Sequence, residues 1–385
     1  MTSTALNKIE TSKRKKVAVY YHAFMGGGAE AVALWMLEAL KENYDLTLFT
    51  IADVDFDKLN SMYGTNLSNN SVKINCLASS LWRPLSNFLI ANNKVIRKLF
   101  IHILIRHFKS KQGDYDLLVS AYNAMDLGRI GIQYIHWIKV VEGSAFYHKV
   151  SNFSEELVRS NISVANSKMV ADAAKQVYGS DSTVVYPPVV IDLPDTSWEQ
   201  KENAFICSGR LTKAKQPHKV IEILSRVREK GFDIKLYMTG GGGGAAAWQY
   251  KQRIQQMVAE NSNWITLYEN LAYKDYINVL AKCKYGIHFK QEPFGISIAE
   301  MLKAGALPFV RSGGGQVEIV GEHNQELFFD NESEAVAKIV ALLSDSTKQE
   351  KMIAALDERK KLFSTERFMA DFNKVVDQYF ENYSH

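Results

Sequence analysis

Cysteine is scarce in this sequence, and its scarcity excludes two kinds of protein. The 385 residues contain three cysteines, Cys76, Cys207 and Cys283, which stand far apart and show no paired spacing. Such a pattern fits neither a disulfide framework nor a cysteine-based zinc site. We therefore expect a protein of a reducing compartment, the cytoplasm.

Two further absences concern charge and targeting. Lysine and arginine number 46 and aspartate and glutamate 42, so the net charge of +4 is too small to favour nucleic acid as a partner. Residues 1–16 are polar, end in the basic run KRKK and contain no apolar stretch that could serve as a signal peptide. We expect a disordered basic tail there and no secretion.

Apolar runs are what the chain has in quantity. Hydrophobic residues make up 46% of it, and its length suffices for two cores. Short runs rich in Val, Ile, Leu and Tyr alternate with helical patterns, such as 29–40 and 168–177, which predicts two α/β units with parallel sheets. Strands are predicted at 17–21, 46–51, 72–77, 117–120, 132–137, 184–186, 204–208, 234–239, 264–268, 285–289 and 307–310.

A break in this alternation marks the domain boundary. After Tyr186-Pro187-Pro188 the chain enters a polar stretch with neither helical nor strand periodicity. Near the end, a helix carries Phe368, Phe372 and Val376 on one stripe, so we expect it to dock on the protein. The predicted division is a tail at 1–16, an N-terminal domain at 17–190, a linker at 191–202, a C-terminal domain at 203–364 and a final helix at 365–385.

A glycine-rich turn, GGGAE at 26–30, follows the first predicted strand and opens a helix. Free backbone N–H groups and the positive end of a helix dipole favour an anion there, and glycine lets a phosphate approach closely. The turn lacks the spacing of a dinucleotide-binding fingerprint. Contact with a ligand and a merely tight turn therefore remain two interpretations of Gly26, Gly27 and Gly28.

The most informative segment is KQEPFGISIAE at 290–300. A strand is predicted to end just before it, Glu292 stays in the loop, and a helix begins near Phe294. The spacing of the glutamates amounts to about 80° of rotation, so Glu292 can reach a ligand at the strand end while Glu300 reaches one along the helix. Two carboxylates and a helix start with free N–H groups suit a nucleotide sugar, although a capped helix with a solvated glutamate is the alternative.

Here the chain resembles a known family, the retaining GT-B glycosyltransferases of the fourth family. The resemblance covers nearly the whole chain and is strongest in the E-x7-E motif of Glu292 and Glu300. It implies two Rossmann-like domains with parallel sheets that face each other across a cleft, and a C-terminal helix that docks back on the N-terminal domain. The other matching motifs are SGRL at 208–211 with Lys215, Ala304-Gly305, SGGG at 312–315 and EIV at 318–320.

The resemblance also implies roles for single residues. Arg210 and Lys215 neutralise the donor diphosphate, which suits their chemistry because charge on the leaving group must be offset without a metal. Glu292 holds hydroxyls of the donor sugar, and Glu300 bonds the ribose. The implied donor-binding set is Gly26, Gly27, Gly28, Arg210, Lys215, Gly240, Glu292, Phe294, Gly295, Ile296 and Glu300, with no metal or other cofactor.

His136 lies in QYIHW at 133–137, at the end of a predicted strand. A lone histidine at a strand end is often structural. Similar enzymes carry a histidine there that faces the sugar, so the resemblance implies a catalytic set of His136, Glu292, Arg210 and Lys215. No carboxylate pair is positioned for double displacement. We therefore favour same-face substitution, in which His136 hydrogen-bonds the sugar and the departing phosphate helps deprotonate the acceptor.

Two other motifs favour structural interpretations. The sequence DVDFD at 53–57 contains the D-x-D pattern that holds a divalent metal in the other common glycosyltransferase fold. It stands in a polar connection after a strand, so we favour a solvated turn for Asp53 and Asp55. The glycine run at 240–244 lacks the Lys-Ser/Thr of a P-loop, and we expect Gly240 at the edge of the donor site and a flexible loop beyond it.

Residues 85–111 form a basic amphipathic segment, in which Leu, Ile and Phe alternate with cations such as Lys94, Arg97 and Arg106. Such a helix can lie in an anionic membrane interface. A helix that packs on its own domain and solvates its basic face explains the same pattern. Peripheral membrane contact, at the inner face of a membrane, therefore stands as one of two hypotheses.

The leading functional hypothesis is transfer of a hexose from a GDP- or UDP-sugar, with retention, to a glycan or lipid-linked acceptor. Residues 26–30, 133–137 and 186–188 most resemble the eukaryotic mannosyltransferases that extend lipid-linked oligosaccharides, which favours GDP-mannose. Lys290 and Lys303 depart from the family pattern, so sugar preference cannot be copied. The alternatives are a nucleotide-sugar hydrolase or epimerase on the same scaffold and a non-catalytic nucleotide-binding subunit.

Overall fold

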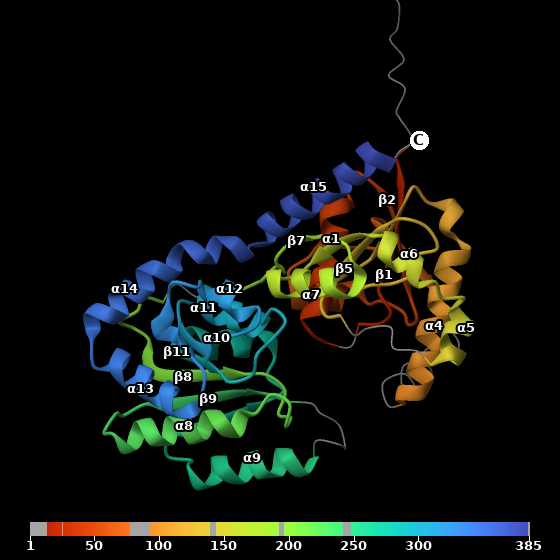
Figure 1. Cartoon of the computed structure of the whole chain (residues 1–385). Coiled ribbons are helices and arrows are strands. Elements are labelled where there is room, and N and C mark those ends of the chain that lie inside the picture. The colour runs from red at the N-terminus through yellow and green to blue at the C-terminus, as the bar shows by residue number, and fades with distance from the viewer. Residues whose placement is uncertain are drawn as a thin grey trace, which may run out of the picture.

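The computed structural model describes residues 14–24, 26–77, 93–138, 144–191, 196–241 and 248–383. These residues form two α/β units that lie side by side, joined at 185–191 and by a long C-terminal helix (Figure 1). Most of the predicted tail, residues 1–13, and part of the predicted linker, residues 192–195, lie outside the described residues.

A seven-stranded parallel sheet in the order β3-β2-β1-β4-β5-β6-β7 forms the N-terminal unit. β1 lies between β2 and β4, with Val17 opposite Leu46 on one side and Leu117 on the other. The strands are β1 Lys16–Tyr20, β2 Asp45–Thr50, β3 Val72–Cys76, β4 Leu117–Ser120, β5 Ile132–Ile135, β6 Ile162–Ala165 and β7 Ser182–Val184. The helices are α1 Gly28–Leu40, α2 Phe56–Tyr63, α4 Lys94–Ser110, α5 Ala145–Ser151, α6 Glu155–Ser160 and α7 Lys168–Tyr178, with a short 3-10 turn, η2, at Gln112–Asp114.

The C-terminal unit repeats this plan with six parallel strands in the order β10-β9-β8-β11-β12-β13. Its strands are β8 Glu202–Ser208, β9 Lys235–Gly240, β10 Ile265–Glu269, β11 Cys283–His288, β12 Leu307–Arg311 and β13 Phe328–Phe329. Its helices are α8 Pro217–Glu229, α9 Trp248–Glu260, α10 Tyr273–Lys282, α11 Ile296–Lys303, α12 Gln316–Val320, α13 Glu332–Leu343 and α14 Ser346–Asp357, with 3-10 turns η4 Gln325–Leu327 and η5 Glu358–Phe363.

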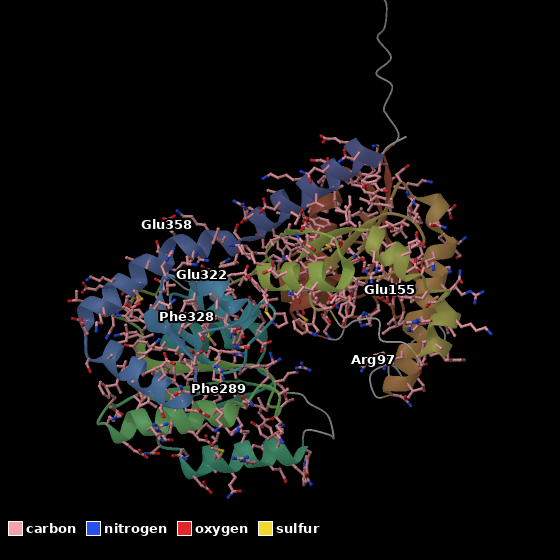
Figure 2. The ribbon with its side chains drawn as sticks, in the orientation of Figure 1. Arg97, Glu155, Phe289, Glu322, Phe328 and Glu358 are labelled. Atoms are coloured by element: carbon pink, nitrogen blue, oxygen red, sulfur yellow. The ribbon has the colours of Figure 1, made fainter. Side chains whose placement is uncertain are left out.

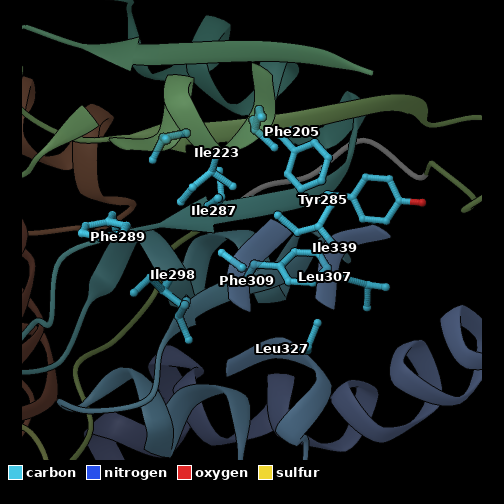
Figure 3. Close-up of a cluster of buried hydrophobic side chains, with 14 of the residues drawn as sticks. Phe205, Ile223, Tyr285, Ile287, Phe289, Ile298, Leu307, Phe309, Leu327 and Ile339 are labelled. Atoms are coloured by element: carbon cyan, nitrogen blue, oxygen red, sulfur yellow. The ribbon is translucent and has the colours of Figure 1, made fainter. Parts of the chain in front are cut away.

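Burial follows the apolar pattern of the sequence. Phe289 and Phe328 lie inside the C-terminal unit, whereas Glu155, Glu322 and Glu358 lie at the surface (Figure 2). Around the central strand β11, aromatic rings fill the core, and the ring of Tyr285 stacks on Phe205 at 4.9 Å between centroids (Figure 3). Each sheet has its own core, as the prediction of two α/β units requires.

The last helix, α15 Thr365–Tyr383, belongs in space to the N-terminal unit, although it follows the C-terminal unit in sequence. It runs along α1 at the top of the molecule (Figure 1). Its apolar stripe is buried in the core formed by β1, β2 and α1, and the Tyr379 hydroxyl donates to the carbonyl of Ile130 at 3.3 Å. The expected docking of the C-terminal helix on the N-terminal domain is confirmed.

The strand orders fix where a ligand can bind. In each sheet the strand order reverses its direction between two neighbouring strands. These are β1 and β4 in the N-terminal unit and β8 and β11 in the C-terminal unit. Loops that follow these neighbouring strands diverge and leave a crevice at the carboxyl ends, which is where doubly wound sheets bind ligands. Among the described residues no helix is long and apolar enough to cross a membrane.

Candidate functional site

Glu292 is the centre of the C-terminal half of the site. It stands in the loop after β11 and is 7% exposed. Its Oε1 accepts from Lys215 Nζ at 2.6 Å and lies 3.0 Å from His288 Nε2, while its Oε2 lies 3.6 Å from Lys290 Nζ. The fold thus brings Lys215 and Glu292 together from the loops after β8 and β11.

The cations around Glu292 keep it ionised. Burial by itself would raise the pKa of the carboxyl group, but the hydrogen bond from His288 and the positive charge of Lys215 outweigh burial and lower the pKa to about 2. The result is a fixed negative charge inside a cationic cluster. A carboxylate in this state can only accept hydrogen bonds, as a contact to sugar hydroxyls requires.

Two other predicted residues lie at the same edge of the sheet. Arg210 is exposed in the loop after β8, and within the described residues its side chain has no ion pair. Gly240 ends β9 so close to the carbonyl of Gly209 that a Cβ atom there would overlap it. Close strand packing therefore accounts for the glycine at 240, and Arg210 keeps its donors available.

The start of α11 supplies backbone donors. Gly295, the N-cap of α11, has a φ of 107°, in the region that favours glycine, and the first N–H groups of a helix lack partners inside it. The Phe294 side chain does not face the crevice, because it is 2% exposed and lies between the rings of Tyr186 and Phe363. The predicted donor contact of Phe294 would therefore have to use its backbone, since the phenyl ring belongs to the core.

Glu300 lies at the wall of a cavity of about 330 Å³ between the two units. Its Oε2 accepts from the hydroxyl of Tyr276 at 2.6 Å, and burial raises the pKa of the carboxyl group to about 7. The cavity is lined from the N-terminal unit by residues of the glycine-rich turn and by Tyr63, and from the C-terminal unit by Tyr273, Ile296 and Ser297. Glu300 is therefore placed to meet a ligand that spans both units.

The glycine-rich turn is positioned as predicted but is not free. The N–H of Gly26 donates to the Glu30 carboxylate, and that of Gly27 donates to the Tyr63 hydroxyl at 3.3 Å. The expectation of free N–H groups is therefore wrong for these two residues in this structure, because side chains of α1 and α2 already occupy them. Gly28 touches α11, since a Cβ atom on it would overlap the side chain of Ile296.

His136 follows β5 and is half-buried. Its backbone N–H is held at 2.6 Å by the side chain of Asn123, which itself adopts a φ of 64°. The ring Nε2 lies 3.0 Å from the carbonyl of Ala121, and because a carbonyl only accepts, Nε2 must carry the proton. Burial lowers the pKa of His136 to about 4, so the ring is neutral at pH 7 and offers Nδ1 as an acceptor.

The two units are tied together beside Glu292. Ser167 Oγ, from the N-terminal unit, donates to the carbonyl of Pro293 at 2.6 Å. Glu318 accepts from the backbone N–H groups of Lys168 and Met169 at 2.8 and 3.2 Å, so a carboxylate of one unit caps the first turn of a helix, α7, in the other. These contacts fix the loop of Glu292 against the N-terminal unit.

The D-x-D motif lies at the start of α2. Asp55 is the N-cap of α2, and its Oδ1 accepts from the N–H of Lys58 at 3.0 Å, so the D-x-D pattern begins a helix. No group of three or more His, Cys, Asp or Glu side chains that could hold a metal exists among the described residues. Residues 242–244 of the glycine run and 85–92 of the amphipathic segment lie outside the described residues.

Several residues of the site were missed by the sequence analysis. His288 stands four residues before Glu292 in the buried strand β11, where nothing local distinguished it from core. Tyr276 and Tyr63 lie on helices, 24 and 33 residues from their carboxylate partners Glu300 and Glu30. Only the packing of α10 and α2 could reveal these two contacts.

Comparison with known sequences finds similarity to glycosyltransferases. Residues 192–359 match the sequence model of the family described as glycosyl transferases group 1. The curated relative named GDP-Man:Man(3)GlcNAc(2)-PP-Dol alpha-1,2-mannosyltransferase, from Dictyostelium discoideum, is 22% identical over 253 residues. That match covers 60% of this chain and 49% of the relative, so the chain spans about half the length of the relative it matches.

Solved structures match the whole fold. HepE of Anabaena, in complex with UDP and glucose, superposes with a TM-score of 0.66 at 17% identity and covers 95% of this chain and 100% of its own. The sucrose-phosphate synthase of Thermosynechococcus elongatus gives a TM-score of 0.66 at 14% identity, covering 96% and 100%. The chain thus has the GT-B fold, and its C-terminal domain matches the group 1 glycosyl transferases.

Proposed function

We propose that the chain is a retaining glycosyltransferase that moves a hexose from a GDP- or UDP-sugar to a glycan or lipid-linked acceptor. Two observations carry the proposal together: Lys215 contacts Glu292 in the C-terminal unit, and Glu300 shares a cavity with the glycine-rich turn of the N-terminal unit, where both sheets reverse their strand order. A cationic edge, an ionised carboxylate and a cavity between two domains together suit a diphosphate, a sugar and a ribose.

In this proposal Lys215 has two partners in turn. Without donor, its ammonium group neutralises Glu292 at 2.6 Å. A donor diphosphate carries more charge than one carboxylate, so Lys215 turns to it, joined by the unpaired Arg210. The Glu292 oxygen that Lys215 leaves then accepts from a sugar hydroxyl, while His288 and Lys290 continue to hold the carboxylate.

The transfer step follows the same geometry. The acceptor hydroxyl oxygen bonds to the anomeric carbon on the face from which the phosphate oxygen leaves, and its proton passes to that phosphate oxygen. Arg210 and Lys215 offset the charge on the leaving diphosphate, and the neutral His136 ring accepts from a sugar hydroxyl through Nδ1. Metal independence is part of this proposal, because two cations already face the diphosphate.

The base and sugar of the donor are a finer part of the proposal. The Dictyostelium relative is named for GDP-Man, while HepE was solved with UDP and glucose. We favour mannose on the motif resemblance of residues 26–30, 133–137 and 186–188. Lys290, whose Nζ lies 3.6 Å from Glu292 Oε2, stands where relatives commonly have serine, so a donor with a different sugar would leave the rest of the proposal intact.

A panel of GDP-, UDP- and other nucleotide sugars tests the proposal. Thermal shift would identify the donor that binds, and nucleotide release would be followed with and without a mixture of glycan and lipid-linked acceptors. We expect one donor class to stabilise the protein and its turnover to depend on acceptor and to survive EDTA. Complete turnover of donor without acceptor would favour the hydrolase or epimerase, and binding without any turnover would favour the non-catalytic subunit.

A membrane is the second partner we propose, through a surface on the outer side of the N-terminal domain. α4 contains no acidic residue, and its exposed side includes Val95, Lys98, Ile103 and Arg106. α5 packs beside it and exposes 63% of Phe146. We call these five residues the α4–α5 surface, and its mixture of apolar side chains and cations suits an anionic lipid interface.

A further inference from the structure

Arg97 is a cation beside the proposed active site, and the proposed function gives it no role. It lies in the first turn of α4, and because α4 returns to the start of β4, its first turn lies at the carboxyl ends of the parallel strands. Figure 2 shows Arg97 at the edge of the N-terminal domain that faces the C-terminal domain. The side chain is half-buried and has neither an ion pair nor a side-chain hydrogen bond within the described residues.

The positive charge of Arg97 acts on two rings, those of His22 and Tyr122, and each ring has a polar atom without a hydrogen-bond partner among the described residues. The ring of Tyr122, after β4, lies 4.3 Å from that of His22, after β1, and among the described residues the Tyr122 hydroxyl has no hydrogen bond. His22 is 6% exposed and its Nδ1 has no partner. Burial lowers the pKa of His22 to about 4, and the positive charge of Arg97 acts in the same direction, so the His22 ring is neutral at pH 7.

These side chains continue the site away from the donor. The Tyr122 ring lies 6.1 Å from the ring of His136, so His136, Tyr122 and His22 follow one another across the ends of β5, β4 and β1. The first half of α4, which carries Arg97, packs on the same apolar cluster as Tyr122. A molecule whose hydroxyl reacts near His136 would extend over Tyr122 to Arg97. A half-buried, unpaired guanidinium group at that point calls for an anion, and its fork of donors matches phosphate oxygens.

We propose that Arg97 and Tyr122 form an acceptor subsite that binds a phosphate group close to the acceptor's reacting sugar. This inference rests on the proposed function, because it assigns the acceptor side of the same reaction. Arg97 donates to the phosphate oxygens, and the Tyr122 hydroxyl donates a further hydrogen bond. His22 lines the subsite as a neutral ring, so it adds no positive charge that would repel Arg97. An acceptor joined to its carrier by a phosphodiester or diphosphate would satisfy it, and a neutral glycan would leave Arg97 unpaired.

Binding of small phosphates by the full-length protein tests the subsite. Phenyl phosphate, benzoate and the neutral phenyl glucoside would be titrated calorimetrically, with the donor site empty and saturated with UDP or GDP. The variants are Arg97→Gln, Arg97→Lys and the matched control Lys98→Gln, which removes the same charge from the exposed side of the same turn. Affinity for UDP and GDP and the melting temperature would be measured for each protein.

We expect phenyl phosphate to bind the nucleotide-saturated wild type and Lys98→Gln equally, and Arg97→Gln at least about tenfold more weakly, because a hydrogen bond to a charged group is lost. Arg97→Lys should fall between them. Equal binding to Arg97→Gln, binding of benzoate as tight as that of phenyl phosphate, or loss of nucleotide affinity in Arg97→Gln would each overturn the assignment. Failure of the wild type to bind any nucleotide would instead count against the proposed function. In that case the titration of phenyl phosphate without nucleotide would still compare Arg97→Gln with the wild type.

Discussion

Lys215 and Glu292 neutralise each other in the empty site, so each residue controls what the other can do. We predict that Lys215→Ala lowers kcat/KM for the donor. The loss should correspond to about 2–4 kcal/mol of transition-state stabilisation, because only one of the two cations remains to offset the charge on the leaving diphosphate. Lys213→Ala, in the same loop but exposed, is the matched control and should stay within about twofold of wild type. Steady-state kinetics of both variants test this prediction, and a wild-type rate in Lys215→Ala would show that Lys215 does not bind the diphosphate.

Glu300 should make donor binding depend on pH. Burial raises its pKa from 4.5 to about 7, so the carboxyl group is protonated below pH 7 and ionises as the pH rises through that value. An ionised carboxylate accepts more strongly from ribose hydroxyls, and nucleotide affinity should therefore increase from pH 6 to pH 8 by severalfold. For stability the sign is opposite, because the folded state holds a proton that the unfolded state loses, so stability falls between pH 4.5 and about 7.

Two variants separate Glu300 from other titrating groups. Glu300→Gln cannot ionise, so its nucleotide affinity, measured calorimetrically, should be flat across this range. Tyr276→Phe removes the hydroxyl whose hydrogen bond lowers the pKa of Glu300, so its midpoint should move to higher pH. A pH profile of Glu300→Gln that matches the wild type would assign the titration to another group.

At the scale of helices and strands, the sequence predicted those elements whose burial comes from their own pattern. The α15 stripe and the strands around β1 and β8 follow directly from apolar spacing. β13 was missed because it spans only two residues, and β6 was missed because its sequence, ISVA, contains serine and alanine and so lacks a continuous apolar run. The prediction of free N–H groups in the glycine-rich turn was wrong for a different reason, because the contact of Tyr63 with Gly27 depends on where α2 packs.

The α4–α5 surface carries the prediction at the element scale. We expect the protein to co-sediment with vesicles that contain anionic lipid and not with zwitterionic vesicles, and added salt should weaken binding by screening the cations. Phe146→Ser with Ile103→Ser should reduce bound protein by about threefold to tenfold, because both side chains lose apolar area that would enter the interface. Val177→Ser is the matched control, since Val177 is 46% exposed on α7. A similar reduction in that control would argue against a specific surface.

For the whole molecule, motifs predicted most of the proposed donor-binding residues, but no motif could show how the two domains contact each other. The loop of Glu292 is anchored to the N-terminal domain by Ser167, and the carboxylate of Glu318 caps α7 across the domain boundary. Each of these bonds joins residues more than 120 positions apart. Their effect is to set the position of the proposed donor-binding residues relative to His136 and Arg97.

This coupling separates binding from transfer in a testable way. Glu318→Ala leaves two N–H groups of α7 without an acceptor, a loss of about 1–2 kcal/mol for a helix cap, and loosens the contact between the domains. Nucleotide affinity should change less than about twofold, since the cations and Glu292 remain in one domain. Transfer should slow by roughly tenfold, because the reacting groups come from both domains. The control Glu322→Ala alters an exposed carboxylate just beyond α12. Calorimetry with UDP or GDP, alongside single-turnover rates, would reveal the split, and a parallel loss of both would place Glu318 within the donor site instead of between the domains.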